Sequence, residues 1–163
     1  MIINYIKGDI VALFLEGNII AHGCNCFHTM GSGVAGQLAK AYPVVLNADK
    51  GLTELGDKEK LGTFSRAVRL YHQDGHAYEV YCFNLYTQYE PGPNLDYGAL
   101  VNCMIELNLQ AKDLLFKPVI YIPRIGCGIA GGDWDKVSRL IDMFTPDIDL
   151  VVVDYESASS TPI

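Results

Sequence analysis

The sequence contains no apolar run that approaches the roughly 20 residues a membrane-spanning helix requires. Residues 1–5 carry neither a basic region nor a small-residue cleavage site, the features that mark a secretory signal. We therefore expect no signal peptide and no membrane partner. Residues 2–6 are instead typical of a short β-strand.

Cysteines are few and irregularly spaced. There are five of them, an odd number, and no Cys-x-x-Cys pair occurs. This pattern favours free thiols in a reducing compartment, so we predict a cytoplasmic protein. Cys24, Cys26 and His28 alternate like metal ligands, but without a clear fourth ligand they do not predict a zinc site. We expect no metal and no cofactor.

Positive charge is also scarce. The chain has 12 Lys and Arg against 19 Asp and Glu, a formal net charge of −7. Proteins that bind nucleic acid neutralise phosphates with Lys and Arg, so this balance argues against a nucleic-acid partner. A small ligand that carries phosphate would have to be held by backbone N–H groups and helix N-termini rather than by a basic patch.

The length and composition are those of one globular domain. The chain has 163 residues, half of them apolar, which suffices for a buried core without disulfides. No linker and no internal repeat divides it. We expect a monomeric single domain over residues 1–156, followed by a short Ser/Thr-rich tail at residues 157–163.

Strand-like and helix-like segments alternate along the chain. An Asp-Gly pair at residues 74–75 predicts a hairpin between two of the strands. Strands separated by helices indicate a three-layer α/β/α domain with a central mixed, mostly parallel sheet. The expected strands cover residues 2–6, 18–22, 63–71, 77–84, 119–123 and 148–154, and the expected helices cover 34–42, 44–55, 97–116 and a segment that Asp133 opens as N-cap.

Two glycine-rich loops hold most of the unusual glycine, at residues 23–33 and 126–132. Each leaves a buried strand and enters a helix, so both lie at the carboxyl ends of strands, where open α/β sheets bind ligands. The helix starts offer unpaired N–H groups to an anion. The glycines at 31, 33 and 36 match a dinucleotide fingerprint in spacing but lie too far beyond their strand, and no P-loop is present.

Four runs in this order resemble the macrodomain family: Lys-Gly-Asp-Ile at 7–10, Ile-Ala-His-Gly-Cys-Asn-Cys at 20–26, Gly-Ser-Gly-Val-Ala at 31–35, and Pro-Arg-Ile-Gly-Cys-Gly-Ile-Ala-Gly-Gly-Asp-Trp at 123–134. The resemblance extends from residue 6 to residue 155. It is greatest to the branch that contains ADP-ribose-1″-phosphate phosphatases and terminal ADP-ribose glycohydrolases. It implies a macrodomain fold and an ADP-ribose derivative as the ligand.

The resemblance also implies a role for individual positions. Asp9 would accept a hydrogen bond from the adenine amino group beside the Ile10 backbone, and Tyr155, just past the last strand, would stack on the adenine. Asn25 would contact the distal ribose, and the two glycine loops would hold the phosphates. The expected ligand-binding residues are Asp9, Ile10, Cys24, Asn25, Gly31, Ser32, Gly33, Val34, Arg124, Gly126, Cys127, Gly128, Ile129, Ala130 and Tyr155.

Departures from the family pattern bear on the reaction. The glycohydrolases of this branch carry a lysine nucleophile in the first loop and an aspartate in the second, where this chain has Ser32 and Ala130. Without an amine the covalent sugar adduct cannot form. We therefore expect a phosphatase that hydrolyses ADP-ribose-1″-phosphate to ADP-ribose and phosphate. His22 or His28 would activate water or protonate the leaving oxygen, with Asp133 as orienting group or base.

Each of these residues also has a purely structural interpretation. His22 ends an apolar strand and could be a core histidine, while His28 could be a solvated loop residue. Asp133 could be only an N-cap, Asp9 could cap the following turn, and Tyr155 could pack on the sheet edge.

Three other functions remain compatible with the sequence. The first is an ADP-ribose reader, which needs the same loops and no catalyst. The second is a glycohydrolase that removes ADP-ribose from a macromolecule, disfavoured by Ser32 and Ala130. The third is an unrelated phosphate-binding hydrolase with Cys127 as its nucleophile.

Overall fold

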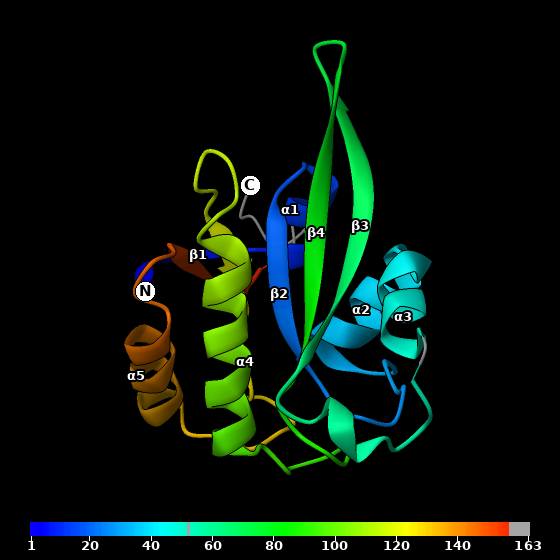
Figure 1. The fold of residues 1–163 in the computed structure, drawn as a ribbon, viewed down its shortest axis with the longest axis vertical. Coiled ribbons are helices and arrows are strands. Elements are labelled where there is room, and N and C mark those ends of the chain that lie inside the picture. The colour runs from blue at the N-terminus through cyan, green and yellow to red at the C-terminus, as the bar shows by residue number, and fades with distance from the viewer. Residues whose placement is uncertain (52, 157–163) are drawn as a thin grey trace.

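The computed structural model describes residues 1–51 and 53–156 and forms one six-stranded sheet between two layers of helices (Figure 1). The strand order is β1-β6-β5-β2-β4-β3, and every neighbouring pair is parallel except β4 and β3. The predicted tail at 157–163 lies outside the described residues. The strands are β1 (Ile2–Gly8), β2 (Ile19–Cys24), β3 (Phe64–Gln73), β4 (His76–Tyr86), β5 (Ile120–Ile122) and β6 (Leu150–Tyr155).

The helices cover both faces of the sheet. On one face α4 and α5 pack over the first hydrophobic core, and on the other α1, α2 and α3 pack over the second. The expected three-layer α/β/α domain with a mixed, mostly parallel sheet is confirmed. The helices are α1 (Ile10–Leu15), α2 (Gly33–Ala41), α3 (Pro43–Lys50), α4 (Tyr97–Ala111) and α5 (Trp134–Phe144), with one 3₁₀ turn, η1 (Lys58–Lys60).

Strand β2 shows why the sheet needs helices on both sides. Ile19 and Ala21 point into the core under α4 and α5, whereas Ile20 points into the core under α1 to α3. Successive side chains of a strand face opposite sides, so a continuous apolar run is buried only when both faces are covered. The sequence run at 18–22 therefore predicted a central strand correctly.

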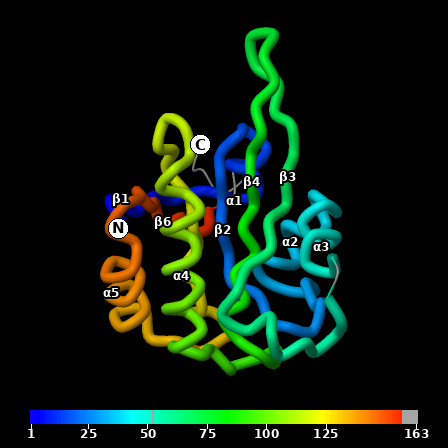
Figure 2. Tube along the Cα trace, viewed as in Figure 1, coloured from blue at the N-terminus to red at the C-terminus, as the bar shows by residue number. Residues whose placement is uncertain are grey.

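The β3–β4 hairpin forms as the Asp-Gly signal predicts. Gln73 pairs with His76 across the turn, and both turn residues, Asp74 and Gly75, have positive φ of 52° and 77°. These are the backbone angles that a two-residue hairpin turn requires. The hairpin tip projects well beyond the rest of the sheet (Figures 1 and 2).

Two helices end earlier than the sequence pattern predicts. The helix expected at 44–55 ends at Lys50, where Gly51 caps it with a positive φ. The helix expected at 97–116 ends at Ala111, and Leu115 is 84% exposed rather than facing the core. Beyond the helix end, Leu114 still packs against the first core, whereas Leu115 and Phe116 are exposed.

Helix α1 was not predicted. Asp9 caps it by accepting a hydrogen bond from the Val11 amide at 2.9 Å, and Ile10 and Phe14 are buried one turn apart. An Asp N-cap followed by apolar residues at i and i+4 was the signal available in the sequence. None of the described helices has the length and apolar character needed to cross a membrane.

Candidate functional site

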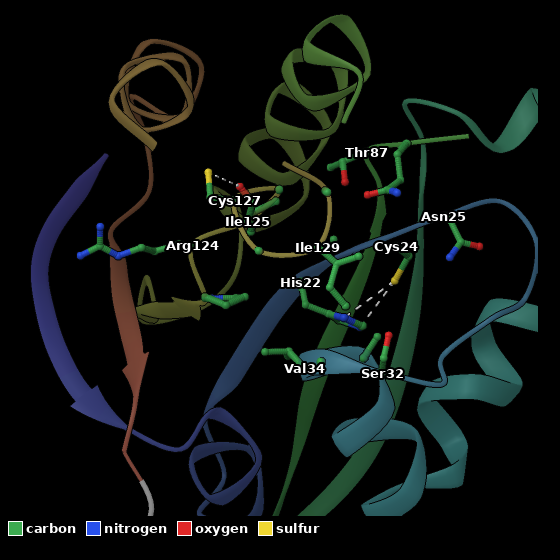
Figure 3. A pocket seen from close by; sticks show the side chains of 18 of the residues that line it. His22, Cys24, Asn25, Ser32, Val34, Thr87, Arg124, Ile125, Cys127 and Ile129 are labelled. Carbon is green, nitrogen blue, oxygen red and sulfur yellow. Dashed lines mark hydrogen bonds between the residues drawn. The ribbon is translucent and has the colours of Figure 1, made fainter. Parts of the chain in front are cut away.

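One cleft of about 640 Å³ opens at the carboxyl ends of the parallel strands (Figure 3), a size that suits a small-molecule ligand. The two glycine-rich loops form its walls, and the ends of β2, β4 and β6 contribute to its lining. The sequence-predicted residues that line it are His22, Cys24, Asn25, Gly31, Ser32, Gly33, Val34, Arg124, Gly126, Cys127, Gly128, Ile129, Ala130 and Tyr155.

Two of the expected catalytic residues do not line this cleft. His28 turns to the α3 side, where its Nε2 lies 3.0 Å from the Thr53 hydroxyl. Asp133 is the N-cap of α5, and its carboxylate accepts the Asp135 amide at 3.0 Å. The structure thus gives Asp133 the capping contact that its sequence position predicts and brings only His22 to the cleft.

The expected adenine-contacting residues gather beside the cleft at the ends of β1 and β6. Gly8 pairs with Tyr155, which places Asp9 next to this rim. Tyr155 is the last residue of β6 rather than the residue after it, which corrects the sequence expectation, and it is 65% exposed. Asp9 uses one carboxylate oxygen to cap α1, and Ile10 is buried; neither residue is among those that line the cleft.

The first wall of the cleft is the start of α2. The first amide that bonds into the helix is that of Gly36, which donates to the Ser32 carbonyl at 2.9 Å. Within the described part of the chain, the amides of Gly33, Val34 and Ala35 have no acceptor, and the Ser32 side chain makes no capping bond. Three N–H groups and the positive end of the helix dipole therefore remain available to an anion.

The second wall is the loop at residues 126–132. It is closed on itself by Gly132, whose amide donates to the Gly126 carbonyl at 2.7 Å. The amides of Gly128, Ile129 and Ala130 have no hydrogen-bond partner among the described residues. This wall therefore offers a second set of free donors.

Glycine is required at position 132 because the chain is crowded there. A Cβ atom on Gly132 would lie 2.4 Å from Leu95 and 2.6 Å from the Gly126 carbonyl oxygen. Gly126 itself has a φ of 74°, which favours glycine. The close packing holds the loop in the shape that leaves its three amides free.

Arg124 is the only Lys or Arg side chain among the described residues that line the cleft, and it is already paired. Its guanidinium donates to both carboxylate oxygens of Asp154, at 2.8 and 3.1 Å, which lowers the pKa of Asp154. It also lies over the rings of Tyr5 and Trp134. The side chain points away from Cys24 and Asn25 (Figure 3), so the walls offer amides and no unpaired cation.

Asn25 is fixed by its own loop. Its Nδ2 donates to the Thr29 hydroxyl at 2.7 Å, and its Oδ1 accepts from the Phe27 amide at 2.9 Å. The side chain therefore has a set orientation at the edge of the cleft before any ligand arrives.

His22 lies at the floor of the cleft and is 1% exposed. Its Nε2 is 2.6 Å from Asn84 Oδ1, and the Cys24 sulfur is within 3.8 Å of the ring (Figure 3). Loss of hydration on burial lowers its pKa to about 4, although the Asn84 hydrogen bond and the charge of Asp49 oppose the shift. The ring is therefore neutral at pH 7.

The cysteines are thiols rather than thiolates. Cys127 packs against the core and donates to the Ile125 carbonyl, and burial raises its pKa to about 11. This disfavours Cys127 as a nucleophile, which must be ionised to react. Within residues 1–51 and 53–156, no three His, Cys, Asp or Glu side chains lie close enough together to hold a metal ion, the group of Cys24, Cys26 and His28 included.

Sequence reasoning missed Thr87, which also lines the cleft. It follows β4 directly and is 1% exposed, and its hydroxyl has no partner among the described residues. A Cβ on Gly23 would lie 2.9 Å from this hydroxyl, so glycine is needed opposite it. The available signal was a polar residue at the carboxyl end of a buried strand parallel to β2.

The Macro domain family matches residues 21–141 of this chain. An uncharacterized 17.5 kDa protein of Enterobacteria phage T4, from the tk-vs intergenic region, is 57% identical over 96% of this chain and 98% of its own length. The ADP-ribose 1″-phosphate phosphatase of Saccharomyces cerevisiae is 25% identical over 92% of this chain and 97% of its own length.

A solved structure shares the fold. The macrodomain of Thermus aquaticus DarG superposes with a TM-score of 0.69 at 19% identity, covering 94% of this chain and 98% of that one.

Proposed function

This chain belongs to the Macro domain family, and on that premise we propose that it binds ADP-ribose in the cleft and hydrolyses ADP-ribose 1″-phosphate to ADP-ribose and phosphate. The observation that carries the proposal is the pair of free amide sets on the two walls of one cleft, above a neutral histidine on its floor. The yeast relative named for this phosphatase activity supports the choice of substrate.

In this proposal the adenine lies at the rim formed by β1 and β6. The free carboxylate oxygen of Asp9 accepts from the adenine amino group, beside the Ile10 backbone. The exposed ring of Tyr155 stacks on the base, a contact worth about 1–3 kcal/mol in comparable stacks. The distal ribose lies beside Asn25.

The diphosphate lies between the two walls. The amides of Val34 and Ala35 approach it from one side, and those of Gly128 and Ile129 from the other. Hydrogen bonds from amides to a charged oxygen contribute about 1.5–3 kcal/mol each. They add no net charge, which explains how a protein of charge −7 could hold an anion without a free Lys or Arg in the cleft.

The reaction in this proposal is attack by water on the phosphorus of the 1″-phosphate. A ring nitrogen of His22 accepts a proton from the water, and the bond between phosphorus and the 1″ oxygen breaks. That oxygen takes a proton from solvent water and leaves as the anomeric hydroxyl of ADP-ribose, and His22 returns its own proton to solvent. Free amides of the two loops steady the phosphate oxygens. A base with a pKa of about 4 is unprotonated throughout the neutral range.

The proposal leaves His28 and Asp133 outside the reaction because neither lines the cleft. It also disfavours a lysine-dependent glycohydrolase, since no lysine lines the cleft in the described part of the chain. An ADP-ribose reader is the second candidate, favoured by the near-complete burial of His22.

Phosphate release from ADP-ribose 1″-phosphate, measured with a chelator present, tests the proposal. We expect turnover by the wild-type protein and a loss of at least a hundredfold in kcat on His22→Gln. Calorimetry with ADP-ribose should give similar affinities for both proteins. Tight ADP-ribose binding without phosphate release would identify a reader, and no binding at near-millimolar ligand would reject the site altogether.

A further inference from the structure

A continuous line of hydrogen-bonded polar side chains, all buried except the half-buried Ser65, leads from the cleft floor to the α3 layer of the domain. It begins at His22 on β2, whose Nε2 contacts Asn84 Oδ1 at 2.6 Å. It continues through Ser65 and Tyr86 and ends at Asp49 on α3, which forms a buried ion pair with Lys60 of η1. The linking distances are 3.1 Å from Asn84 Nδ2 to Ser65 Oγ, 2.6 Å from Ser65 Oγ to Tyr86 Oη, 2.8 Å from Tyr86 Oη to Asp49 Oδ1 and 2.8 Å from Lys60 Nζ to Asp49 Oδ1.

The direction of these hydrogen bonds can be assigned from the Asp49 end. A carboxylate only accepts, so the Lys60 ammonium and the Tyr86 hydroxyl both donate to Asp49. The Tyr86 hydroxyl has one hydrogen, and it is donated to Asp49. Its oxygen must therefore accept from Ser65, whose hydroxyl hydrogen is used in turn.

Counting donors and acceptors in the same way assigns the orientation of the Asn84 amide and the protonated nitrogen of His22. Ser65 can now only accept from Asn84, and the Val45 carbonyl also accepts from Asn84, so both contacts need the NH₂ group of the amide. The carbonyl oxygen of Asn84 then faces His22, and the hydrogen between them must be on Nε2 of His22. The unprotonated nitrogen of the neutral ring is Nδ1.

We propose that Asn84 is a positioning residue that holds His22 in the Nε2–H tautomer, so that Nδ1, which lies 3.8 Å from the Cys24 sulfur, is the nitrogen able to accept a proton. This inference rests on the proposed function only for its consequence in catalysis; the tautomer itself is a property of the free protein. Every hydrogen bond of the line runs in one direction, toward the Asp49 carboxylate. Bonds aligned in this way strengthen one another, which makes Nδ1 a better base than in an isolated buried histidine.

The line explains two features that the fold alone does not require. The Asp49–Lys60 pair is almost completely buried, at 1% and 4% exposure, although burying an ion pair seldom adds stability. The charge of Asp49 also acts on His22, since it opposes the lowering of the His22 pKa by burial. A buried anion at the end of a hydrogen-bonded line accounts for both.

Nitrogen-15 NMR of the unliganded protein at pH 7 tests the tautomer without any substrate. The resonances of His22 are identified by their absence from the His22→Gln spectrum. We expect the hydrogen to be coupled to Nε2 and the Nδ1 shift to be that of an unprotonated nitrogen. A hydrogen on Nδ1, or a doubly protonated ring, would overturn the proposal whether or not the protein hydrolyses phosphate.

The kinetic consequence is tested by Tyr86→Phe, which removes one hydroxyl from the line. We expect kcat to fall about tenfold, as when outer partners of a functional histidine are lost, with the ADP-ribose Kd unchanged. Tyr81→Phe is the matched control on the same strand, because among the described residues the Tyr81 hydroxyl hydrogen-bonds to Glu79 alone. Should Tyr86→Phe not fold, Ser65→Ala breaks the same line.

Equal losses of kcat and ADP-ribose affinity in Tyr86→Phe and Ser65→Ala would overturn the positioning role, because a merely structural defect affects both. An unchanged kcat in either folded variant would overturn it as well. If wild-type protein lacks phosphatase activity, the proposed function fails. The NMR result still decides whether His22 is held in the Nε2–H tautomer in the free protein.

Discussion

Replacing His22 by Gln should change how the stability of the protein depends on pH. His22 is fully buried, and its pKa is lowered to about 4 from an ordinary value of 6.5. As the pH falls below 6.5, the unfolded chain takes up a proton on this histidine while the folded protein does not. The unfolded state then binds more protons, so the free energy of unfolding must decrease toward acid.

The size of this effect follows from the shift. One pKa unit corresponds to about 1.4 kcal/mol, so the whole shift of about 2.5 units is worth about 3 kcal/mol when the pH reaches 4. Relative to pH 7.5, the loss from His22 alone is about 1 kcal/mol at pH 5.5 and about 2 kcal/mol at pH 5.0. Gln does not titrate, and its amide can still donate to Asn84.

Urea unfolding at several pH values measures the prediction. The stability of wild type should fall more steeply than that of His22→Gln, and the two curves should diverge by about 2 kcal/mol between pH 7.5 and 5.0. His72→Gln is the matched control, because His72 is exposed on the hairpin and loses little hydration on folding. Parallel curves for wild type and His22→Gln would refute the reasoning and mean that His22 is protonated, and hence solvated, in the folded protein.

Two further predictions concern the walls of the cleft. Val34→Pro removes one free amide at the start of α2, where proline is tolerated, so the ADP-ribose Kd measured by calorimetry should rise about tenfold. The control variant Val34→Ala keeps the amide and should change the Kd little. Equal Kd values for the two variants would show that this amide does not bind the ligand. Gly132→Ala should cost at least 2 kcal/mol of unfolding free energy, because its Cβ would meet Leu95 and the Gly126 carbonyl at under 3 Å. Gly128→Ala, in the same loop, meets nothing within 4 Å and should be neutral in urea unfolding; similar stabilities for these two glycine variants would contradict the crowding argument.

The sequence predicted the architecture because the signals for it are local. Apolar runs of strand length, the Asp74-Gly75 turn and the Asp133 N-cap depend on neighbouring residues only, and each forms as expected. Helix ends were predicted less well. The apolar pattern continues after Ala111, yet the helix ends there; Leu114 packs against the core, whereas Leu115 and Phe116 are exposed. That information belongs to the path of the chain in three dimensions.

Strand, loop and helix follow one another along the chain, so the sequence was enough to predict that two glycine loops would open helices at the carboxyl ends of buried strands. Which polar residues meet there depends instead on how the chain packs in three dimensions. It turned His28 toward Thr53, placed Thr87 in the cleft and joined His22 to Asp49 through three other side chains. The protonation state of a histidine depends on its burial and its partners, and those partners are 27 to 62 residues away. Contacts between residues so far apart along the chain are made by packing, and the local sequence does not reveal them.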